Sequence, residues 1–300
     1  MGNMLFIVNP RSGKARIKNQ LLGIVDLFIK YGWDVQLYIT QDQGDAIETA
    51  RKKGGQMDMI VCSGGDGTLS ETISGMMYME HPPILGYIPS GSTNDFAASL
   101  GIPSQAGKAA EIVVTGEARP IDIGYFCQER TFVYVAGFGV FTEVSYMTPQ
   151  EKKNLLGHQA YMLEGVKSLA NIKSYRMRIE ADDFCMEGDF IFGMVTNTIS
   201  VGGFKGLVTQ DVALDDGVFE VLMIRTPKTP LELTNILSYM ILKEEQSEYV
   251  HKFKTSRLRI FSEEEVDWVL DGEFGGARRE VEIENLTQRI KIVTGLVKKR

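Results

Sequence analysis

The feature that most constrains this chain is a glycine-rich turn, Gly64-Gly65-Asp66-Gly67-Thr68, directly after the apolar run Met57–Cys62. Three glycines around one carboxylate and one hydroxyl contribute little to a hydrophobic core. They let backbone N–H groups come close to phosphate oxygens, because no side chain stands in the way. The run Leu69–Met79 predicts a helix whose N-terminus adds partial positive charge at the same place. A nucleoside triphosphate is therefore the first ligand to consider.

Strand and helix patterns alternate through the first part of the chain. The predicted strands are Met4–Val8, Asp34–Ile39, Met57–Cys62 and Pro83–Ile88. The predicted helices are residues 15–31, Asp45–Lys53, Leu69–Met79, Asn94–Leu100 and Lys108–Thr115. Repeated strand–helix units favour right-handed crossovers, so we expect a mostly parallel sheet.

The character of the chain changes near Asp122, and short β-rich runs separated by turn residues predict an antiparallel sandwich. These runs are Thr131–Ala136, Tyr175–Ala181, Cys185–Asn197, Phe219–Ile224, Arg257–Phe261, Val266–Leu270 and Glu280–Ile283, with helices around Ala160–Asn171 and Pro230–Lys243. We therefore expect an α/β fold of two domains, an open parallel-sheet domain over residues 1–122 and a β-sandwich over residues 123–285. Residues 286–300, with the strand Arg289–Val293, are candidates to complete the first domain.

Composition limits the partners and the compartment. The net charge of -7 argues against nucleic acid as the main partner. Three widely spaced cysteines without a CxxC pattern predict reduced thiols rather than a disulfide frame or a zinc site. Met1–Val8 has no basic segment and no cleavage site, and no apolar stretch reaches the roughly 20 residues that a spanning helix needs. We expect a cytoplasmic protein that touches lipid only peripherally, at the inner face of the membrane.

Polar loops follow three of the predicted strands, where an open parallel sheet gathers its ligands. They are Asn9-Pro10-Arg11-Ser12-Gly13-Lys14, the glycine turn around Asp66, and Pro89-Ser90-Gly91-Ser92-Thr93-Asn94-Asp95-Phe96. The first lacks the glycine order of a P-loop. Each loop alone also fits an ordinary structural role, since Asn9-Pro10 can end a strand and Asn94 or Asp95 can cap a helix. Together they favour one shared nucleotide site.

At these residues the chain resembles the catalytic domain of the diacylglycerol kinase family, specifically its soluble bacterial lipid kinases. Six motifs in the family's order carry the resemblance, which covers nearly the whole chain: Asn9–Gly13, Gly64–Thr68, Gly91–Ala97, Ala136-Gly137-Phe138-Gly139, Leu214-Asp215-Asp216-Gly217 and Asp271-Gly272-Glu273. The glycine signature alone is also similar to NAD kinases and phosphofructokinases. The resemblance implies an α/β nucleotide-binding domain and a β-sandwich lipid domain, with the active site in the cleft between them.

The resemblance also implies the site residues. It implies that ATP is held by Asn9, Pro10, Arg11, Ser12, Gly13, Thr40, Gly64, Gly65, Asp66, Gly67, Thr68, Leu69, Ser70 and Thr93. It implies a structural Mg²⁺ site made by the Asp216 carboxylate and the backbone carbonyls of Ala213 and Val218. Glu273 is implied as the proton acceptor.

The chemistry of phosphoryl transfer gives these acids distinct roles. Asp66 can hold Mg²⁺ directly or through water, because Mg²⁺ binds few carboxylates, and it can equally cap the following helix. Glu273 lies among glycines and can take a proton from a lipid hydroxyl. Asp-Gly pairs are also common hairpin turns, at Asp271-Gly272 and at Asp216-Gly217 alike. Asp122 is a further acid near the domain junction.

Apolar residues offer a candidate acyl-chain pocket, although aromatic and Met residues at this density more often form ordinary core. They are Phe138, Phe141, Tyr146, Tyr161, Met162 and Phe204. The segment Leu231–Leu242 is amphipathic, so it can rest on a membrane surface or pack against the sandwich. The basic end Lys298-Lys299-Arg300 is either a patch that contacts the membrane or a solvated tail.

Two positions depart from the family pattern, Ala98 in place of Arg and Gln210 in place of Pro. Neither lies in the glycine turn or at Glu273. The leading prediction is an ATP- and Mg²⁺-dependent kinase that phosphorylates a lipid hydroxyl at a membrane surface in phospholipid biosynthesis, with diacylglycerol as the first candidate. The alternatives are a soluble-substrate kinase of NAD kinase or phosphofructokinase type and a non-catalytic lipid-binding regulator. A homodimer is compatible with the sequence.

Overall fold

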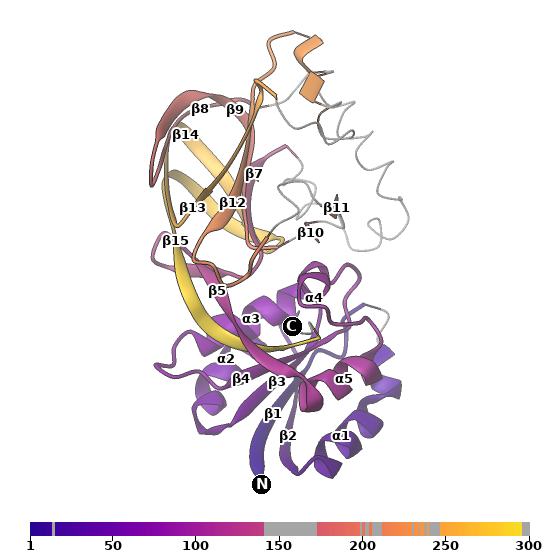
Figure 1. Cartoon of the computed structure of the whole chain (residues 1–300). Coiled ribbons are helices and arrows are strands. Elements are labelled where there is room, and N and C mark those ends of the chain that lie inside the picture. Colours follow the sequence, from indigo (N-terminus) through magenta and orange to yellow (C-terminus); the bar gives the residue numbers. More distant parts are fainter. Residues whose placement is uncertain are drawn as a thin grey trace.

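The computed structural model describes residues 1–13, 16–140, 173–198, 200–201, 204–205, 212–229, 231–233, 235–236, 239 and 247–295. Helices gather around a parallel sheet at one end of the molecule, and the other end consists mainly of antiparallel strands (Figure 1). The chain is therefore an α/β protein with one large multistranded sheet, and the predicted fold class is confirmed at this level.

Four parallel strands in the order β2-β1-β3-β4 form the sheet at the helical end. They are β1 (Gly2–Val8), β2 (Trp33–Ile39), β3 (Met59–Gly64) and β4 (Ile84–Pro89). The helices are η1 (Arg16–Asn19), α1 (Leu21–Lys30), α2 (Asp45–Lys53), η2 (Gly54–Gln56), α3 (Asp66–Met76), α4 (Asp95–Ser99) and α5 (Ala106–Thr115). The α1–α5 and α2–α3 pairs are in contact, and apolar strand residues such as Phe6 and Val61 are fully buried.

The start of α3 differs from the sequence prediction in a way that matters for the site. The helix begins at Asp66 rather than at Leu69, so Asp66, Gly67 and Thr68 form its first turn. Gly65 is the extended residue before it. An acidic residue in a first turn is favourable, because it faces the positive end of the helix dipole.

The antiparallel strands wrap around a second set of buried residues. They are β5 (Glu117–Phe126), β6 (Arg130–Phe132), β7 (Val135–Gly139), β8 (Tyr175–Ala181), β9 (Cys185–Thr196), β12 (Phe219–Arg225), β13 (Val250–Thr255) and β14 (Arg257–Leu270). A separate short pair is β10 (Ser200–Val201) with β11 (Phe204–Lys205). Strands β9 and β14 each pair with β7 at one end and with β8 at the other, so this part of the sheet closes on itself.

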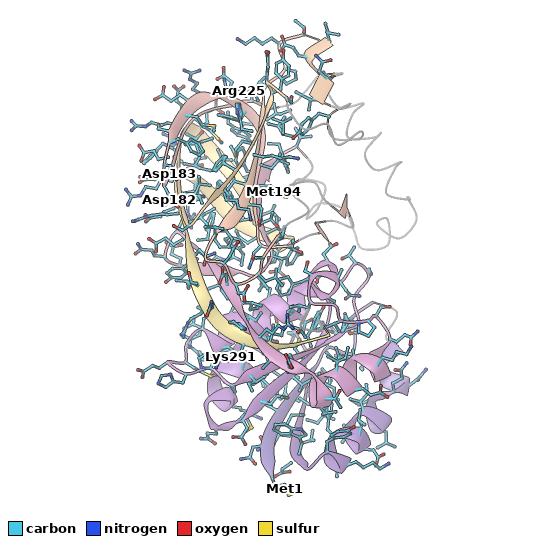
Figure 2. The ribbon with its side chains drawn as sticks, in the orientation of Figure 1. Met1, Asp182, Asp183, Met194, Arg225 and Lys291 are labelled. Carbon is cyan, nitrogen blue, oxygen red and sulfur yellow. The ribbon has the colours of Figure 1, made fainter. Side chains whose placement is uncertain are left out.

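The last strand, β15 (Glu273–Thr294), belongs to both ends of the molecule. It pairs antiparallel with β14 and β5, and near its end Ile292 pairs in parallel with Leu85 of β4. Figure 1 shows it as one curved ribbon running from the antiparallel strands to the helical end, and Figure 2 labels Lys291 on its final segment. The two strands predicted at Glu280–Ile283 and Arg289–Val293 are parts of this one strand, and its pairing with β5 shifts between Leu286 and Ile290.

Three further boundaries differ from the sequence patterns. Arg257–Phe261 and Val266–Leu270 are one strand, β14, whose register shifts between the two runs. The predicted strand Thr131–Ala136 is interrupted between β6 and β7, because the backbone N–H groups of residues 133–135 donate to the Asp271 carboxylate instead of a neighbouring strand. Strands β5 and β13 were not predicted.

Buried apolar side chains form two large clusters, one at each end of the molecule. One joins the parallel strands with their helices and takes in Ile290 and Ile292 of β15. The other fills the antiparallel strands around Trp268, whose ring lies 5.0 Å from that of Phe138 and 5.3 Å from that of Phe126. A smaller cluster on the outside of β9 and β12 contains Ile236 and Tyr239, so the described part of Leu231–Leu242 packs against strands.

Candidate active site

The three polar loops after β1, β3 and β4 lie against one another. Asn9 N donates to Ser63 O (2.8 Å), and Ser90 N donates to Gly64 O (2.8 Å). Asn9 also reaches the glycine turn through its side chain, with Nδ2 donating to Thr68 Oγ1 (3.0 Å). The structure thus brings the three sequence-predicted loops together at the carboxyl ends of the parallel strands.

Close backbone packing explains the glycines of these loops. A Cβ atom at Gly64 would overlap the side chain of Thr68, and one at Gly91 would lie 2.6 Å from Gly65 Cα. Gly13 has a φ of +54° and a Cβ there would overlap Ser90 O. Gly67 differs, because a Cβ there would meet only Glu273 Oε1, at 3.7 Å. The face of the first α3 turn at Gly67 is therefore open.

We call Gly64–Ser70 the phosphate loop. Its second half is the first turn of α3, whose backbone N–H groups have no partner within the helix. Such a turn is suited to anionic oxygens. Leu69 is fully buried, so it can offer a ligand only its backbone, and the Ser70 hydroxyl donates to Asp271 Oδ2 (2.7 Å).

Asp66 points into the protein rather than toward solvent. Its carboxylate accepts hydrogen bonds from Thr93 Oγ1 (3.3 Å), Asp95 N (3.1 Å) and Phe96 N (3.4 Å). Burial, and then the neighbouring charge of Asp95, raise the pKa of Asp66 to about 6. Asp66 thus joins the loops after β3 and β4, and Thr93 lies beside it as the sequence predicted for a shared site.

The remaining predicted nucleotide residues lie around the first loop. Thr40 is buried after β2, where its N–H donates to Val8 O (3.0 Å). Arg11 is exposed, and its N–H donates to Asn9 Oδ1 (3.0 Å). Pro10 and Ser12 are half-buried beside it. These positions come from the ends of neighbouring strands, β1 and β2.

Asp271 fixes the turn that presents Glu273. It has a φ of +50° and is buried, and its carboxylate accepts hydrogen bonds from Val133 N (2.8 Å), Tyr134 N (3.0 Å) and Val135 N (3.1 Å). With the bond from Ser70, it connects α3 to the antiparallel strands. Burial raises the pKa of Asp271. These contacts leave the Asp271 oxygens engaged in holding the turn.

Glu273 is half-buried and lies opposite the phosphate loop. Its Oε1 atom accepts a hydrogen bond from Gln43 Nε2 (3.2 Å) and is the atom closest to the open face of Gly67. A cavity of about 560 Å³ borders both residues and continues along Ser70, Met77, Leu286 and Arg289. The glycine turn and the candidate base therefore lie beside one another at the wall of this cavity.

We call Ala213–Val218 the acidic loop. Asp216 is exposed, accepts from Val218 N (3.3 Å) and lies 3.7 Å from Lys254 Nζ. The buried Asp122 holds the loop, because its Oδ2 accepts from Gly217 N (2.7 Å) and its Oδ1 accepts from Gln288 N (2.7 Å). Asp122 is thus a structural clamp on the acidic loop.

A metal can be considered at either loop. Within the residues that the structure describes, no three His, Cys, Asp or Glu side chains cluster as a metal site. One carboxylate with carbonyl oxygens at the acidic loop is a donor set that suits Mg²⁺, which keeps several waters. The nearest charge to Asp216 there is the Lys254 ammonium, so a cation would compete with it.

Several functional candidates were not singled out from the sequence. Asp95, buried beside Asp66, was considered only as a cap, and Asp271 only as part of a hairpin turn. Gln43 carried no signal, because its partner lies 230 residues away in the chain.

The acyl-pocket prediction is only partly covered by the structure. Phe138 is fully buried in the aromatic core of the antiparallel strands. Phe141, Tyr146, Tyr161, Met162, the Phe204 side chain, Gln210, residues 298–300 and the helix expected around residues 160–171 lie outside the described residues. Ala98 is exposed on α4.

Comparisons with known proteins agree with this geometry. The model of the diacylglycerol kinase catalytic domain matches residues 3–126. A diacylglycerol kinase of Bacillus subtilis (strain 168) is 36% identical over 274 residues, which cover 90% of this chain and 89% of the relative. The chain belongs to the diacylglycerol kinase family. The resemblance inferred from the six motifs is confirmed.

Other members extend the match along the whole chain. A diacylglycerol kinase of Staphylococcus saprophyticus is 33% identical over 291 residues, 96% of this chain and 94% of the relative. Two solved structures from Bacillus anthracis str. Sterne, named as candidate diacylglycerol kinases, have TM-scores of 0.85 and 0.84 at 27% and 26% identity. Both cover 98% of this chain, and it covers 95% and 97% of theirs. In the part of this family member that the structure describes, the helices are too short or too polar to cross a bilayer.

Proposed function

We propose that this protein is an ATP-dependent lipid kinase that transfers the γ-phosphate of ATP to a lipid hydroxyl, with diacylglycerol as the first candidate acceptor and phosphatidic acid as its product. The observation that carries the proposal is the placement of Glu273 Oε1 against the open face of Gly67. A phosphate site and a carboxylate base in reach of it are what transfer to an alcohol needs. The names of the relatives, which are diacylglycerol kinases, support the acceptor class.

The nucleotide would lie over the three loops, with its phosphates on the phosphate loop and on Asn9–Gly13, and with Thr40 and Thr93 at the sides. The first turn of α3 and the small residues of these loops support this assignment. The acceptor hydroxyl would enter from the cavity beside Glu273. As the oxygen of the hydroxyl bonds to the γ-phosphorus, its proton passes to the Glu273 carboxylate and ADP leaves.

Mg²⁺ belongs to this proposal as the ion that neutralises phosphate charge. Asp66 and Asp216 are the candidate carboxylates, and Ala213 and Val218 would add backbone carbonyls to the second site. We also propose the division into residues 1–122 and 123–285, because one buried cluster joins the parallel strands with their helices and the other fills the antiparallel strands. The membrane-surface location and the homodimer stay predictions.

The base is tested by Glu273→Gln, which keeps the shape of the side chain and removes its ability to take a proton. Transfer of labelled phosphate from ATP to diacylglycerol in mixed micelles should fall about 10³-fold, within the range that general bases contribute. ATP binding should stay within twofold. Glu280→Gln, an exposed glutamate on the same strand, is the matched control. Full transfer by the Glu273 variant would remove that residue from its role.

The substrate class is tested by offering the enzyme labelled ATP with an extracted lipid mixture, with NAD and with fructose 6-phosphate. Label in one lipid species identifies the acceptor. Label in NAD or the sugar would instead support a soluble-substrate kinase. Lipid binding without any transfer would support a non-catalytic regulator.

A further inference from the structure

The segment Gln41–Gly44, between β2 and α2, reaches from the predicted nucleotide site to Glu273. It begins directly after Thr40 and ends at the N-cap of α2. We call it the β2–α2 loop. At its start, the Asp45 carboxylate accepts hydrogen bonds from Gln41 N (2.7 Å) and Asp42 N (3.2 Å). These two bonds lower the pKa of Asp45, so its charge holds the loop at neutral pH.

The other end of the β2–α2 loop is attached to α3. Gly44 N donates to Glu71 Oε1 (2.9 Å), one turn beyond Gly67 in the helix. Gly44 has a φ of +85°, a conformation that glycine adopts without strain. The backbone on both sides of Gln43 is therefore fixed before its side chain makes any contact, which reduces the entropy cost of that contact.

From this fixed position, the Gln43 amide donates to Glu273 Oε1 at 3.2 Å. An amide N–H that donates to a carboxylate oxygen limits the orientations that the carboxylate can adopt. Because one oxygen is occupied by Gln43, the other oxygen is left as the acceptor for a proton. The contact links two segments that are 230 residues apart in the chain.

The other charged groups around Glu273 make this donor important. Glu71 on α3 and Asp271 in the same turn are both acidic, and burial followed by the charge of Glu273 raises the pKa of Glu71. Arg130 on β6 donates to the Phe274 carbonyl (2.7 Å). Glu129 and Arg289 also line the cavity. Among the residues that the structure describes, Gln43 is the side-chain donor to Glu273 itself.

We propose that Gln43 is a positioning residue for the candidate base, holding the Glu273 carboxylate in place beside the phosphate loop. This inference rests on the proposed function, in which Glu273 takes the proton of the acceptor hydroxyl. It adds a residue of the β2–α2 loop to the reaction, although that residue touches neither the phosphate nor the acceptor. A loop that starts at the predicted nucleotide site thereby controls the base.

The first test compares Gln43→Ala with Gln41→Ala. Gln41 is the matched control, because it lies in the same exposed loop and its side chain donates to Ile39 O (3.1 Å) instead. With ATP and diacylglycerol in mixed micelles, kcat of the Gln43 variant should fall about fivefold to tenfold, while KM for ATP stays within twofold. The control should stay within twofold on both. Equal kcat values in the two variants would overturn the proposal.

The second test introduces charge with Gln43→Glu and Gln41→Glu. A carboxylate at position 43 removes the donor and repels the charged form of Glu273, so the acid limb of the pH–kcat profile should move up by about one pH unit. The Gln41 variant should move it by no more than about a third of a unit, because an exposed, more distant charge is screened. Equal displacement in both variants would contradict a specific contact with Glu273.

The two proposals fail in different ways. If Glu273→Gln keeps full activity, the proposed base is wrong and Gln43 loses its role with it. If Glu273→Gln abolishes transfer but the Gln43 variants behave like the Gln41 variants, only the positioning role is wrong. In the double variant Gln43→Ala with Glu273→Gln, the loss should equal that of Glu273→Gln alone, because residues acting through one another are not additive.

Discussion

The phosphate loop and the acidic loop are both predicted to meet charged ligands, yet they treat their own polar groups in opposite ways. The phosphate loop buries its acid, Asp66, and leaves the backbone N–H groups of its first helical turn without partners in the helix. The acidic loop exposes its acid, Asp216, and its backbone is bound by the protein, since Gly217 N donates to Asp122 and Asp215 O accepts from Gln288. The phosphate loop therefore offers donors to an anionic ligand, whereas the acidic loop uses its polar groups to hold its own conformation.

The largest effect on stability is expected from replacing Asp122, the buried residue that clamps the acidic loop. Asp122→Ala should lower the free energy of unfolding by about 4 kcal/mol, because it leaves several buried donors without an acceptor. Urea unfolding measures this. Asp215→Ala, an exposed acid in the same loop, is the control and should cost less than about 0.5 kcal/mol. Similar values for both variants would show that the loop does not depend on its clamp.

The buried acid of the phosphate loop should appear in the pH dependence of stability. Burial raises the pKa of Asp66 from its ordinary value of 3.8 to about 6, so the folded protein binds this proton more tightly than the unfolded chain. The free energy of unfolding should therefore fall by about 3 kcal/mol as the pH rises from about 4 to about 6. Thermal melts of wild type and Asp66→Asn across this range test it, and the variant should show a flatter slope.

The glycines of the two loops make a matched pair. Gly67→Ala adds a methyl group only 3.7 Å from Glu273 Oε1, at a helical position where alanine is favoured. Activity should fall about 30-fold without loss of stability. Gly217→Ala, at a φ of +82°, should instead cost about 1 kcal/mol of stability and leave activity within threefold. Activity assays and thermal melts of both variants test this pattern. A Gly67 variant that loses stability but keeps its activity, or a Gly217 variant that loses activity but keeps its stability, would contradict it.

The smallest effect is expected at the exposed pair of the acidic loop. Asp216→Asn removes an exposed charge 3.7 Å from Lys254 Nζ, and should change stability by less than about 1 kcal/mol, as surface ion pairs do. If Asp216 holds a magnesium ion, titration with MgCl₂ should stabilise the wild type more than the variant. Equal stabilisation of both would argue against a cation at this loop.

The helical end of the molecule was largely predictable, because its strands and helices carry strong local patterns. Helix α2 matches its predicted bounds, and β1, β3 and β4 lie within a few residues of theirs. The gathering of the three polar loops followed from the rule that parallel strands end at one edge. The start of α3 was misplaced, because glycines at 65 and 67 weaken any helical signal there.

The antiparallel end was harder to predict, since its strands are defined by distant partners. β5 and β13 were missed, and β15 was divided, because polar residues between its two predicted runs, such as Asn285 and Gln288, interrupt its apolar alternation. The contacts of the site depend on the same distant pairings. Neither the Ser70–Asp271 hydrogen bond nor the Gln43–Glu273 hydrogen bond can be recognised from the sequence around its residues.

Strand β15 has a mechanical consequence for the whole chain. Its first residue is Glu273, and twenty residues of continuous ribbon later it is hydrogen-bonded beside β4. Stripping this ribbon away would open both buried clusters at once, so neither half is expected to melt alone, and calorimetry should record one cooperative transition. Because Glu273 starts this ribbon, a change in how the ribbon bends should move the Glu273 side chain relative to Gly67.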